Sequence, residues 1–390
     1  MTDTVVAHLS AEALCGGYRA AAEAAPRLAA VRSSIASLLN ASATDIALTD
    51  NATRAWQAVF YALPFGPGDR ILTCRAEYAS NVIAFLQTAE RTGARIEVVD
   101  DDETGQLDVE DLRRRMDERV RLIAITHVPT QGGLVNPAEE VGRVAEEAGV
   151  PFLLDACQSA GQLDLDVERL RCDALSAPGR KYLRGPRGTG FLYVRPRLRE
   201  RLRPAVLDLH SAVWTGPDSY EIDKTARMFE TWERGVAATL GLGAAVDYAL
   251  SLGLGRIEER VCDLARRLRD DLRQVPGVQV HDQGARQCGI VTFAVGGMPS
   301  AEVHHRLTRL NVNTSVSLRE YARYDLGARD LPDLVRASVH YYNTEEELRR
   351  LVEAVDGLPA GRPRGRSRDL PGNVLARGYS APADKTIAEP

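Results

Sequence analysis

The stretch Pro151-Phe152-Leu153-Leu154-Asp155 decides the fold, because it is an unbroken apolar run that ends at a carboxylate. A short run of this kind is typical of a strand whose two faces are both buried, as in a parallel sheet covered by helices. The stretch Gly190-Phe191-Leu192-Tyr193-Val194 has the same character and follows a glycine-rich loop. We therefore expect both stretches to be central strands.

Outward from these runs, strand patterns alternate with helical patterns over much of the chain. Strands are expected at residues 45–49, 69–74, 95–99 and 122–126. Helices are expected at 31–39 and 137–148, together with one that begins at residue 53 and another that ends at residue 85. Strands of roughly 4 to 8 residues that alternate with helices indicate βαβ units. The expected fold class is α/β, with a mainly parallel sheet sandwiched by helices.

Near Gly253 the pattern changes. A long charged helix is expected at 257–274, then strands near 278–281 and 289–294 and a helix at 300–310, which predict a smaller C-terminal α+β domain. We divide the chain into an N-terminal segment (1–30), a large domain (31–250) and a small domain (251–358). Residues 359–390 are rich in Pro, Gly, Arg and Ser, which predicts a poorly ordered tail.

The composition favours an ordinary globular protein that binds small molecules or other subunits. The chain has 390 residues, 44% hydrophobic, and a formal net charge of -5 without a basic stripe, so we expect no nucleic-acid partner. No apolar run reaches the roughly 20 residues that span a bilayer, and the N-terminus lacks a signal-peptide pattern, so a cytoplasmic location is expected. The six cysteines lack zinc-site spacing, and we expect neither metal nor disulfide.

Three polar segments stand where an open α/β sheet binds its ligand, at the carboxyl ends of strands. Asp155 ends the first apolar run, Lys181 lies among three arginines in a glycine-rich loop, and Asp50-Asn51-Ala52-Thr53 leads from a strand into a helix. Cationic neighbours favour an uncharged lysine, and a helix N-terminus suits a phosphate. Each segment also has a plain structural interpretation. Asp155 fits a helix cap or turn, the Lys181 loop fits a solvated basic loop, and the segment 50–53 fits an N-cap.

A family resemblance brings the three segments together. Leu153-Leu154-Asp155-Ala156-Cys157-Gln158-Ser159, followed by Gly179-Arg180-Lys181 and by Gly185-Pro186-Arg187-Gly188-Thr189-Gly190, resembles the class V aminotransferase family of fold-type I enzymes that use pyridoxal 5′-phosphate (PLP). Cysteine desulfurases, selenocysteine lyases and isopenicillin N epimerase belong to this family. The resemblance runs from about residue 16 to 357, and it implies the fold-type I PLP-dependent transferase fold with PLP as cofactor.

The resemblance also implies roles for single residues. Lys181 would be the Schiff-base lysine, and Asp155 would pair with the cofactor's ring nitrogen so that the ring acts as an electron sink. The other implied contacts are Gln158 near the phenolic oxygen, Ala52 and Thr53 at the phosphate, Tyr78 over the ring, Thr130 beside the cofactor where relatives often have Asn, and Arg336 at the substrate carboxylate. Tyr78 also fits a half-buried packing residue, and Arg336 a structural partner of the acidic cluster 345–347. His340 is expected to be a packed or hydrogen-bonded histidine.

Several positions depart from the family pattern. Arg180 precedes the lysine where desulfurases often have His, Pro178 replaces a Ser, and the Gly-Thr through which a neighbouring subunit touches the phosphate is missing from 229–235. Arg234 or Arg180 is expected to supply the phosphate's positive partner instead. The sequence also begins close to the first helix, without the strand-like opening segment of relatives. The family builds its site between subunits, so we expect a homodimer in which the 225–234 loop reaches the neighbour.

The reaction type is less sharply defined. A desulfurase needs a nucleophilic Cys on the loop before the carboxylate arginine, and residues 313–325 contain none. The segment Gly16-Gly17-Tyr18-Arg19 and the Gly-Pro-Arg-Gly loop look similar to the ergothioneine-pathway C–S lyase branch, which favours β-elimination from an S-substituted cysteine. The alternatives are an aminotransferase, an epimerase or a decarboxylating deaminase of a specialised amino acid, and a non-catalytic PLP-fold binding protein.

Overall fold

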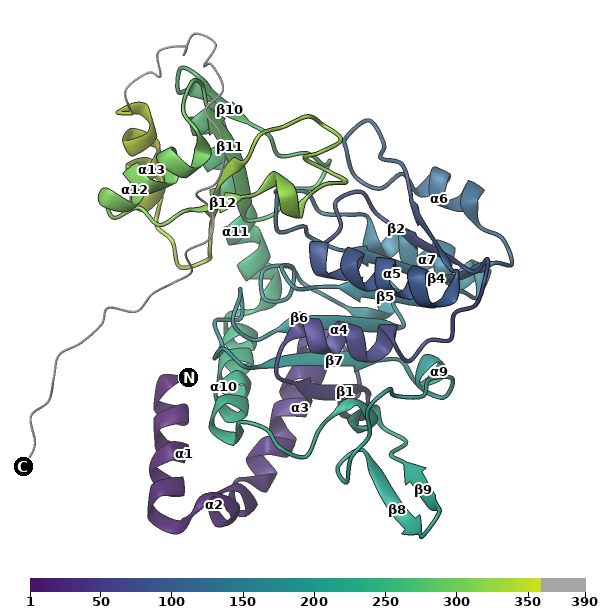
Figure 1. Ribbon diagram of the computed structural model, residues 1–390. Coiled ribbons are helices and arrows are strands. Elements are labelled where there is room, and N and C mark those ends of the chain that lie inside the picture. The colour runs from purple at the N-terminus through teal and green to yellow at the C-terminus, as the bar shows by residue number, and fades with distance from the viewer. Residues whose placement is uncertain (359–390) are drawn as a thin grey trace, which may run out of the picture.

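The computed structural model describes residues 1–358, so the expected tail at 359–390 lies outside the described residues (Figure 1). A seven-stranded sheet forms the centre, in the order β1-β7-β6-β5-β4-β2-β3. Its strands are β1 (Ile46–Thr49), β2 (Arg70–Thr73), β3 (Arg95–Val98), β4 (Val120–Thr126), β5 (Phe152–Asp155), β6 (Ala174–Pro178) and β7 (Gly190–Val194). Only β7 runs against the others, so the sheet is mainly parallel, as predicted.

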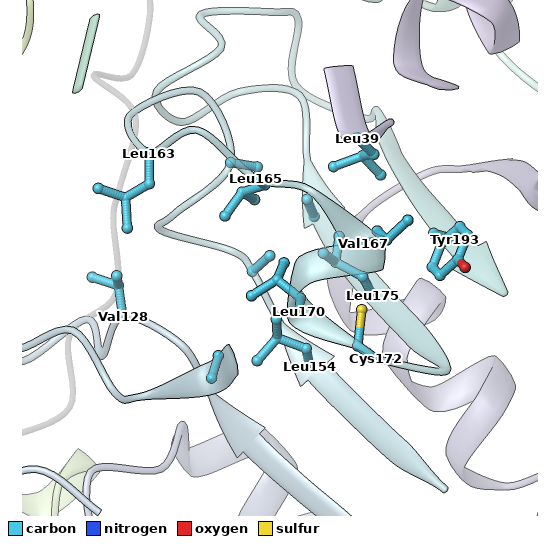
Figure 2. Close-up of a cluster of buried hydrophobic side chains, with 14 of the residues drawn as sticks. Leu39, Val128, Leu154, Leu163, Leu165, Val167, Leu170, Cys172, Leu175 and Tyr193 are labelled. Atoms are coloured by element: carbon cyan, nitrogen blue, oxygen red, sulfur yellow. The ribbon is translucent and has the colours of Figure 1, made fainter. Parts of the chain in front are cut away.

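Helices cover both faces of this sheet because its strand residues alternate between two apolar clusters. Leu153 packs on one face with α4 and α5, whereas Leu154 packs on the other with α3, α7 and α10. Figure 2 shows part of this second cluster, in which Leu154, Leu175 and Tyr193 lie opposite Leu39. The helices of this layer system are α3 (Ala25–Leu39), α4 (Ala52–Phe60), α5 (Ala79–Thr92), α6 (Val109–Arg115), α7 (Ala138–Ala148), α8 (Val167–Leu170), α9 (Pro196–Arg199) and α10 (Val236–Leu252).

A second, antiparallel sheet follows in the C-terminal part of the chain, in the order β10-β11-β13-β12. It packs against its own helices around a separate apolar cluster. The last helix begins at a capping box, in which Thr344 caps the backbone of Glu347 and the Glu347 side chain returns the bond. The elements are α11 (Leu254–Gln274), β10 (Val278–Val280), β11 (Ile290–Val295), α12 (Ser300–Arg309), β12 (Ser315–Ser317), β13 (Leu334–Ser338) and α13 (Glu345–Asp356).

Other elements were not predicted. Two helices, α1 (Thr2–Cys15) and α2 (Gly17–Glu23), precede α3, and α3 itself begins at Ala25 rather than at residue 31. The strand β7 is interior but lies beside the edge strand β1, so it is less central than expected. A hairpin of β8 (Ala212–Gly216) and β9 (Ser219–Ile222) projects from the body of the molecule (Figure 1). Short 3-10 turns occupy Ala43–Asp45, Ala226–Phe229 and Arg319–Tyr321.

Three further features bear on the function classes considered above. Within residues 1–358, no single helix is long and apolar enough to cross a membrane; α10 and α11 pass that test jointly, but the chain bends by 80° between them. All six cysteines are free thiols. In the same described part of the chain, no group of three or more His, Cys, Asp or Glu side chains is arranged to hold a metal ion.

Candidate active site

The carboxyl edge of the large sheet carries a cavity, because the parallel strands all end there. Segments that follow β1, β2, β4, β5 and β6 meet around it, although they are far apart in the sequence. Eight of the predicted site residues line this cavity, which we call the Lys181 cavity: Ala52, Thr53, Tyr78, Thr130, Asp155, Gln158, Arg180 and Lys181. Arg234 and Arg336 are not among its lining residues.

Lys181 enters the cavity from the tight turn after β6. The turn requires glycine at position 179, since a Cβ there would lie 2.3 Å from the Thr189 Oγ1 atom. Burial lowers the pKa of the Lys181 amine against the opposing effects of Cys157 and Asp155, and the charges of Arg180 and Arg336 act in the same direction as burial. Among the described residues, Lys181 forms no ion pair. A buried amine that loses its proton easily is suited to nucleophilic and base chemistry.

Asp155 ends β5 at the floor of the cavity and is only 2% exposed. Its Oδ1 atom accepts a 2.8 Å hydrogen bond from the backbone of Cys157. Asp155 therefore does stabilise a turn, but this role uses only one of its two carboxylate oxygens. Its Oδ2 atom accepts a 3.0 Å bond from Asn81 Nδ2. A buried carboxylate without a cationic partner among residues 1–358 is costly, and a protonated ring nitrogen would supply that partner.

The N-terminus of α4 forms the opposite wall. Asn51 caps the helix by accepting a 2.9 Å hydrogen bond from the backbone of Arg54, and Ala52 and Thr53 form the first turn, where N–H groups have no acceptor within the helix. Gly190 of β7 passes close to this turn, because a Cβ on it would lie 2.8 Å from the Asn51 carbonyl carbon and 3.0 Å from the Ala52 nitrogen. The arrangement is suited to a phosphate.

A chain of hydrogen bonds joins the cavity to the small sheet. Gln158 Nε2 donates to Thr130 Oγ1 at 2.7 Å, and Arg336 Nη1 donates to the same hydroxyl at 2.8 Å and to the Thr130 carbonyl at 2.7 Å. The Arg336 Nε atom is buried without a hydrogen-bond partner in the described chain. The Nε–H group of Arg336 thus has an unused donor, and the Nε–Nη2 edge of a guanidinium is suited to binding a carboxylate with two parallel bonds.

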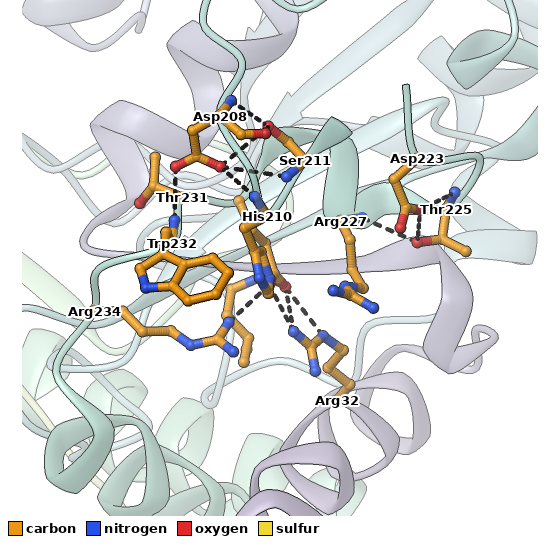
Figure 3. A network of polar contacts seen from close by, with 12 residues as sticks. Arg32, Asp208, His210, Ser211, Asp223, Thr225, Arg227, Thr231, Trp232 and Arg234 are labelled. Carbon is orange, nitrogen blue, oxygen red and sulfur yellow. Dashed lines mark hydrogen bonds and ion pairs between the residues drawn. The ribbon is translucent and has the colours of Figure 1, made fainter. Parts of the chain in front are cut away.

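Arg234 has a different environment from Arg180. Its guanidinium donates a 2.7 Å hydrogen bond to Glu230, which also binds Arg32 and His210. Figure 3 labels Arg234, Arg32 and His210, the three partners of this carboxylate. Although burial acts to raise it, bonds from His210 and Arg32 hold the pKa of Glu230 at about 2. Arg234 lines a neighbouring cavity of about 420 Å³ that shares Asp50 and Gly188 with the Lys181 cavity. Of the two arginines predicted for the phosphate, only Arg180 lies at the Lys181 cavity.

Two polar residues of the site were missed in the sequence. Glu77, at the end of the β2 loop, and Asn81, in the first turn of α5, lie directly behind Asp155. Glu77 lies before Tyr78, the N-cap of α5, so the two residues share no helical face and the sequence carries no periodic signal for the pair. His340, by contrast, packs as predicted, since its ring stacks on Tyr182 with centroids 5.1 Å apart and its Nε2 atom lies 3.1 Å from the Tyr182 carbonyl.

A lysine with a lowered pKa, a buried carboxylate and a helix N-terminus, gathered at the carboxyl edge of a mainly parallel sheet, define the class of fold-type I PLP enzymes. Lys181, Asp155 and the first turn of α4 fit the aldehyde, the ring nitrogen and the phosphate of that cofactor. The model described as Aminotransferase class-V matches residues 2–351, so the chain belongs to the class V aminotransferase family and is a PLP-dependent enzyme.

Known proteins of this family are similar to the chain over most of its length. It is 30% identical over 346 residues to a Methanothermobacter thermautotrophicus protein named "Probable cysteine desulfurase", covering 88% of this chain and 86% of that one. It is 31% identical over 354 residues to a cysteine desulfurase of an Enterobacter species, covering 86% and 84%. The apo structure of a cysteine desulfurase from Thermococcus onnurineus superposes with a TM-score of 0.84 at 27% identity, covering 91% and 92%.

Proposed function

We propose that this enzyme is a C–S β-lyase that cleaves an S-substituted cysteine. The observation that carries the proposal is the composition of residues 313–325, the segment around β12 that precedes the Arg336 strand, because it contains no cysteine to receive a sulfur atom. Cys157 lies at the cavity, but burial raises the pKa of its thiol, so that it stays protonated and is a poor nucleophile. The transfer of sulfur to a cysteine of the enzyme, which a desulfurase needs, is therefore not part of the proposed reaction.

The residues of the site suggest how each part of the substrate is handled. PLP, when bound, supplies an electron sink for the electron pair left at the substrate Cα. The Nε–Nη2 edge of Arg336 binds the substrate carboxylate and orients the Cα–H bond. The Lys181 amine, once released from its bond to the cofactor by the substrate amine, removes the Cα proton; the Cβ–S bond then breaks, and the sulfur leaves as a thiolate that is protonated. Hydrolysis of the remaining three-carbon fragment yields pyruvate and ammonia.

A product screen tests this function. Incubation with S-alkyl cysteines and cystine is expected to release pyruvate, ammonia and the sulfur product in equal amounts, and cysteine to release no alanine. Cys157→Ala is expected to keep at least about half of the turnover, since the thiol has no chemical step. Alanine formed together with a protein-bound persulfide would establish desulfurase activity instead. Transfer of the amino group to a keto acid would establish an aminotransferase.

We also propose that the enzyme works as a homodimer. Apolar side chains on the β8–β9 hairpin and beside it are exposed: Val206, Leu209, Val213, Trp214, Tyr220 and Trp232. Exposed apolar patches of this kind mark protein–protein contacts. Sedimentation is expected to give twice the mass of the 42.6 kDa chain, and Trp214→Glu to shift the equilibrium toward a less active monomer. A fully active wild-type monomer would contradict the proposal.

A further inference from the structure

Two buried carboxylates are joined through a single amide group behind the Lys181 cavity. The Nδ2 atom of Asn81 donates one hydrogen bond to Glu77 Oε1 at 2.9 Å and another to Asp155 Oδ2 at 3.0 Å. The reverse amide orientation would set the Asn81 oxygen against two carboxylates, so the contacts determine which way the amide points. Asn81 therefore transmits any change at Glu77 to the carboxylate that faces the cavity.

Glu77 is unusual among the buried acids of this protein. It is 7% exposed and accepts bonds from the Tyr78 backbone at 2.7 Å, from Thr73 Oγ1 at 3.0 Å and from Thr126 Oγ1. No arginine, lysine or histidine pairs with it among residues 1–358, whereas the buried Glu230 pairs with Arg32 and Arg234. A buried negative charge that is held only by neutral donors exerts a strong field on its neighbours.

We propose that Glu77 is a positioning residue that holds Asn81, and through it Asp155, and whose negative charge strengthens the hold of the proton on the cofactor's ring nitrogen. Because Asn81 bonds to both carboxylates, Glu77 and Asp155 are only two hydrogen bonds apart. At so short a distance, the negative charge of Glu77 still favours a positive charge beside Asp155. The inference rests on the proposed function only for the role of Asp155 at the cofactor ring.

The influence of Glu77 depends on pH. Burial above all, with a smaller effect of Asp155, raises its pKa to about 7, against the bonds from Thr126 and Asn81. Two other titratable groups lie near it or its partner: the Cys74 thiol, whose pKa is raised by burial, and Lys181, which interacts with Asp155 from the cavity side. Glu77 is thus mostly ionised at pH 8.5 and mostly neutral at pH 6, so its effect on the ring nitrogen is expected to grow as pH rises.

The test measures the ring nitrogen itself. Holoenzyme is reconstituted with PLP labelled with ¹⁵N in the ring, and the protonation of that nitrogen is followed by solid-state NMR from pH 6 to 8.5. At pH 8.5, Glu77→Gln is expected to lower the proton affinity of the nitrogen about 10-fold, a shift of about one pKa unit, and to have little effect at pH 6. Glu77→Asp keeps the charge and is expected to restore most of that affinity.

Two further variants separate charge from shape. Asn81→Ala cuts the bridge but keeps both carboxylates, and it is expected to weaken cofactor binding about 10-fold while the nitrogen stays protonated. Asp111→Asn changes another buried carboxylate, which pairs with Arg114 and Arg115 on α6, and is expected to leave the NMR signal unchanged. This control distinguishes a specific effect from a general loss of stability.

The outcomes that overturn the inference are distinct from failure of the proposed function. If the protonation of the ring nitrogen at pH 8.5 is unchanged in Glu77→Gln but altered in Asp155→Asn, Glu77 alone is removed from the mechanism. Equal changes in Glu77→Gln and Asp111→Asn also overturn the inference, because the effect is then structural. Wild-type cofactor affinity in Asn81→Ala overturns the positioning role. An unchanged nitrogen in Asp155→Asn removes the proposed role of Asp155, and the inference falls with it.

Discussion

Lys181→Ala is expected to lower kcat by about 10⁴-fold or more, which corresponds to about 5.5 kcal/mol of transition-state stabilisation. The reason is that one amine is assigned both the covalent attachment of the cofactor and the removal of the substrate proton. Among residues 1–358, Lys181 is the only lysine that lines the cavity, so no other described lysine can take over either role. Purified wild-type enzyme is expected to be yellow, and the variant to lose that absorbance.

Borohydride reduction followed by peptide mapping checks the assignment directly. The chain has three lysines, Lys181, Lys224 and Lys385, so a label can be assigned to one of them without ambiguity. The label is expected on Lys181, and Lys224→Ala serves as the matched control with wild-type colour and turnover. A labelled Lys224, or a yellow and active Lys181→Ala protein, would refute the role given to Lys181.

The central strands of the fold could be predicted closely because they are short, apolar and bounded by turns. β5 and β7 are examples, with bounds within one residue of those expected. β6 was missed, since Ala174-Leu175-Ser176-Ala177-Pro178 is rich in small residues with weak strand preference, and its conformation depends on pairing with β5 and β7. α1 was missed because it buries only His8, so it shows no apolar stripe.

Some residues of the candidate site could likewise be predicted from the sequence, and others could not. Lys181, Asp155 and Thr53 could be predicted because each stands at a strand end or helix start that is visible locally. The bond from Asn81 to Asp155 spans 74 positions of the sequence and the one from Arg32 to Glu230 spans 198, so neither has a local signature. The phosphate role was assigned equally to Arg180 and Arg234 because the sequence does not show that Arg234 pairs with Glu230, four positions before it in a loop, within a cluster that Arg32 completes.

Arg336→Lys is expected to lower kcat/KM by about 10-fold to 1,000-fold, on the order of 1.4–4 kcal/mol, while cofactor absorbance stays normal. Lysine keeps the positive charge but cannot bind a carboxylate with two parallel bonds. The structure leaves the Nε–H donor unused for such a pair, because the hydrogen bonds of Arg336 to Thr130 all use Nη1. Steady-state kinetics measured per bound cofactor gives the comparison.

The rival role for Arg336, as a structural partner of the acidic cluster 345–347, predicts lower thermal stability with unchanged kinetics. The cluster is engaged elsewhere, since Glu345 pairs with Arg267 at 2.9 Å and Glu347 accepts a 3.0 Å bond from the Thr344 backbone. Arg267→Lys is therefore the matched control, and it is expected to change neither kcat/KM nor Tm appreciably, as the pair is exposed. If Arg336→Lys lowers Tm but keeps wild-type kinetics per bound cofactor, Arg336 does not bind the substrate carboxylate, and its unused Nε–H donor has another partner.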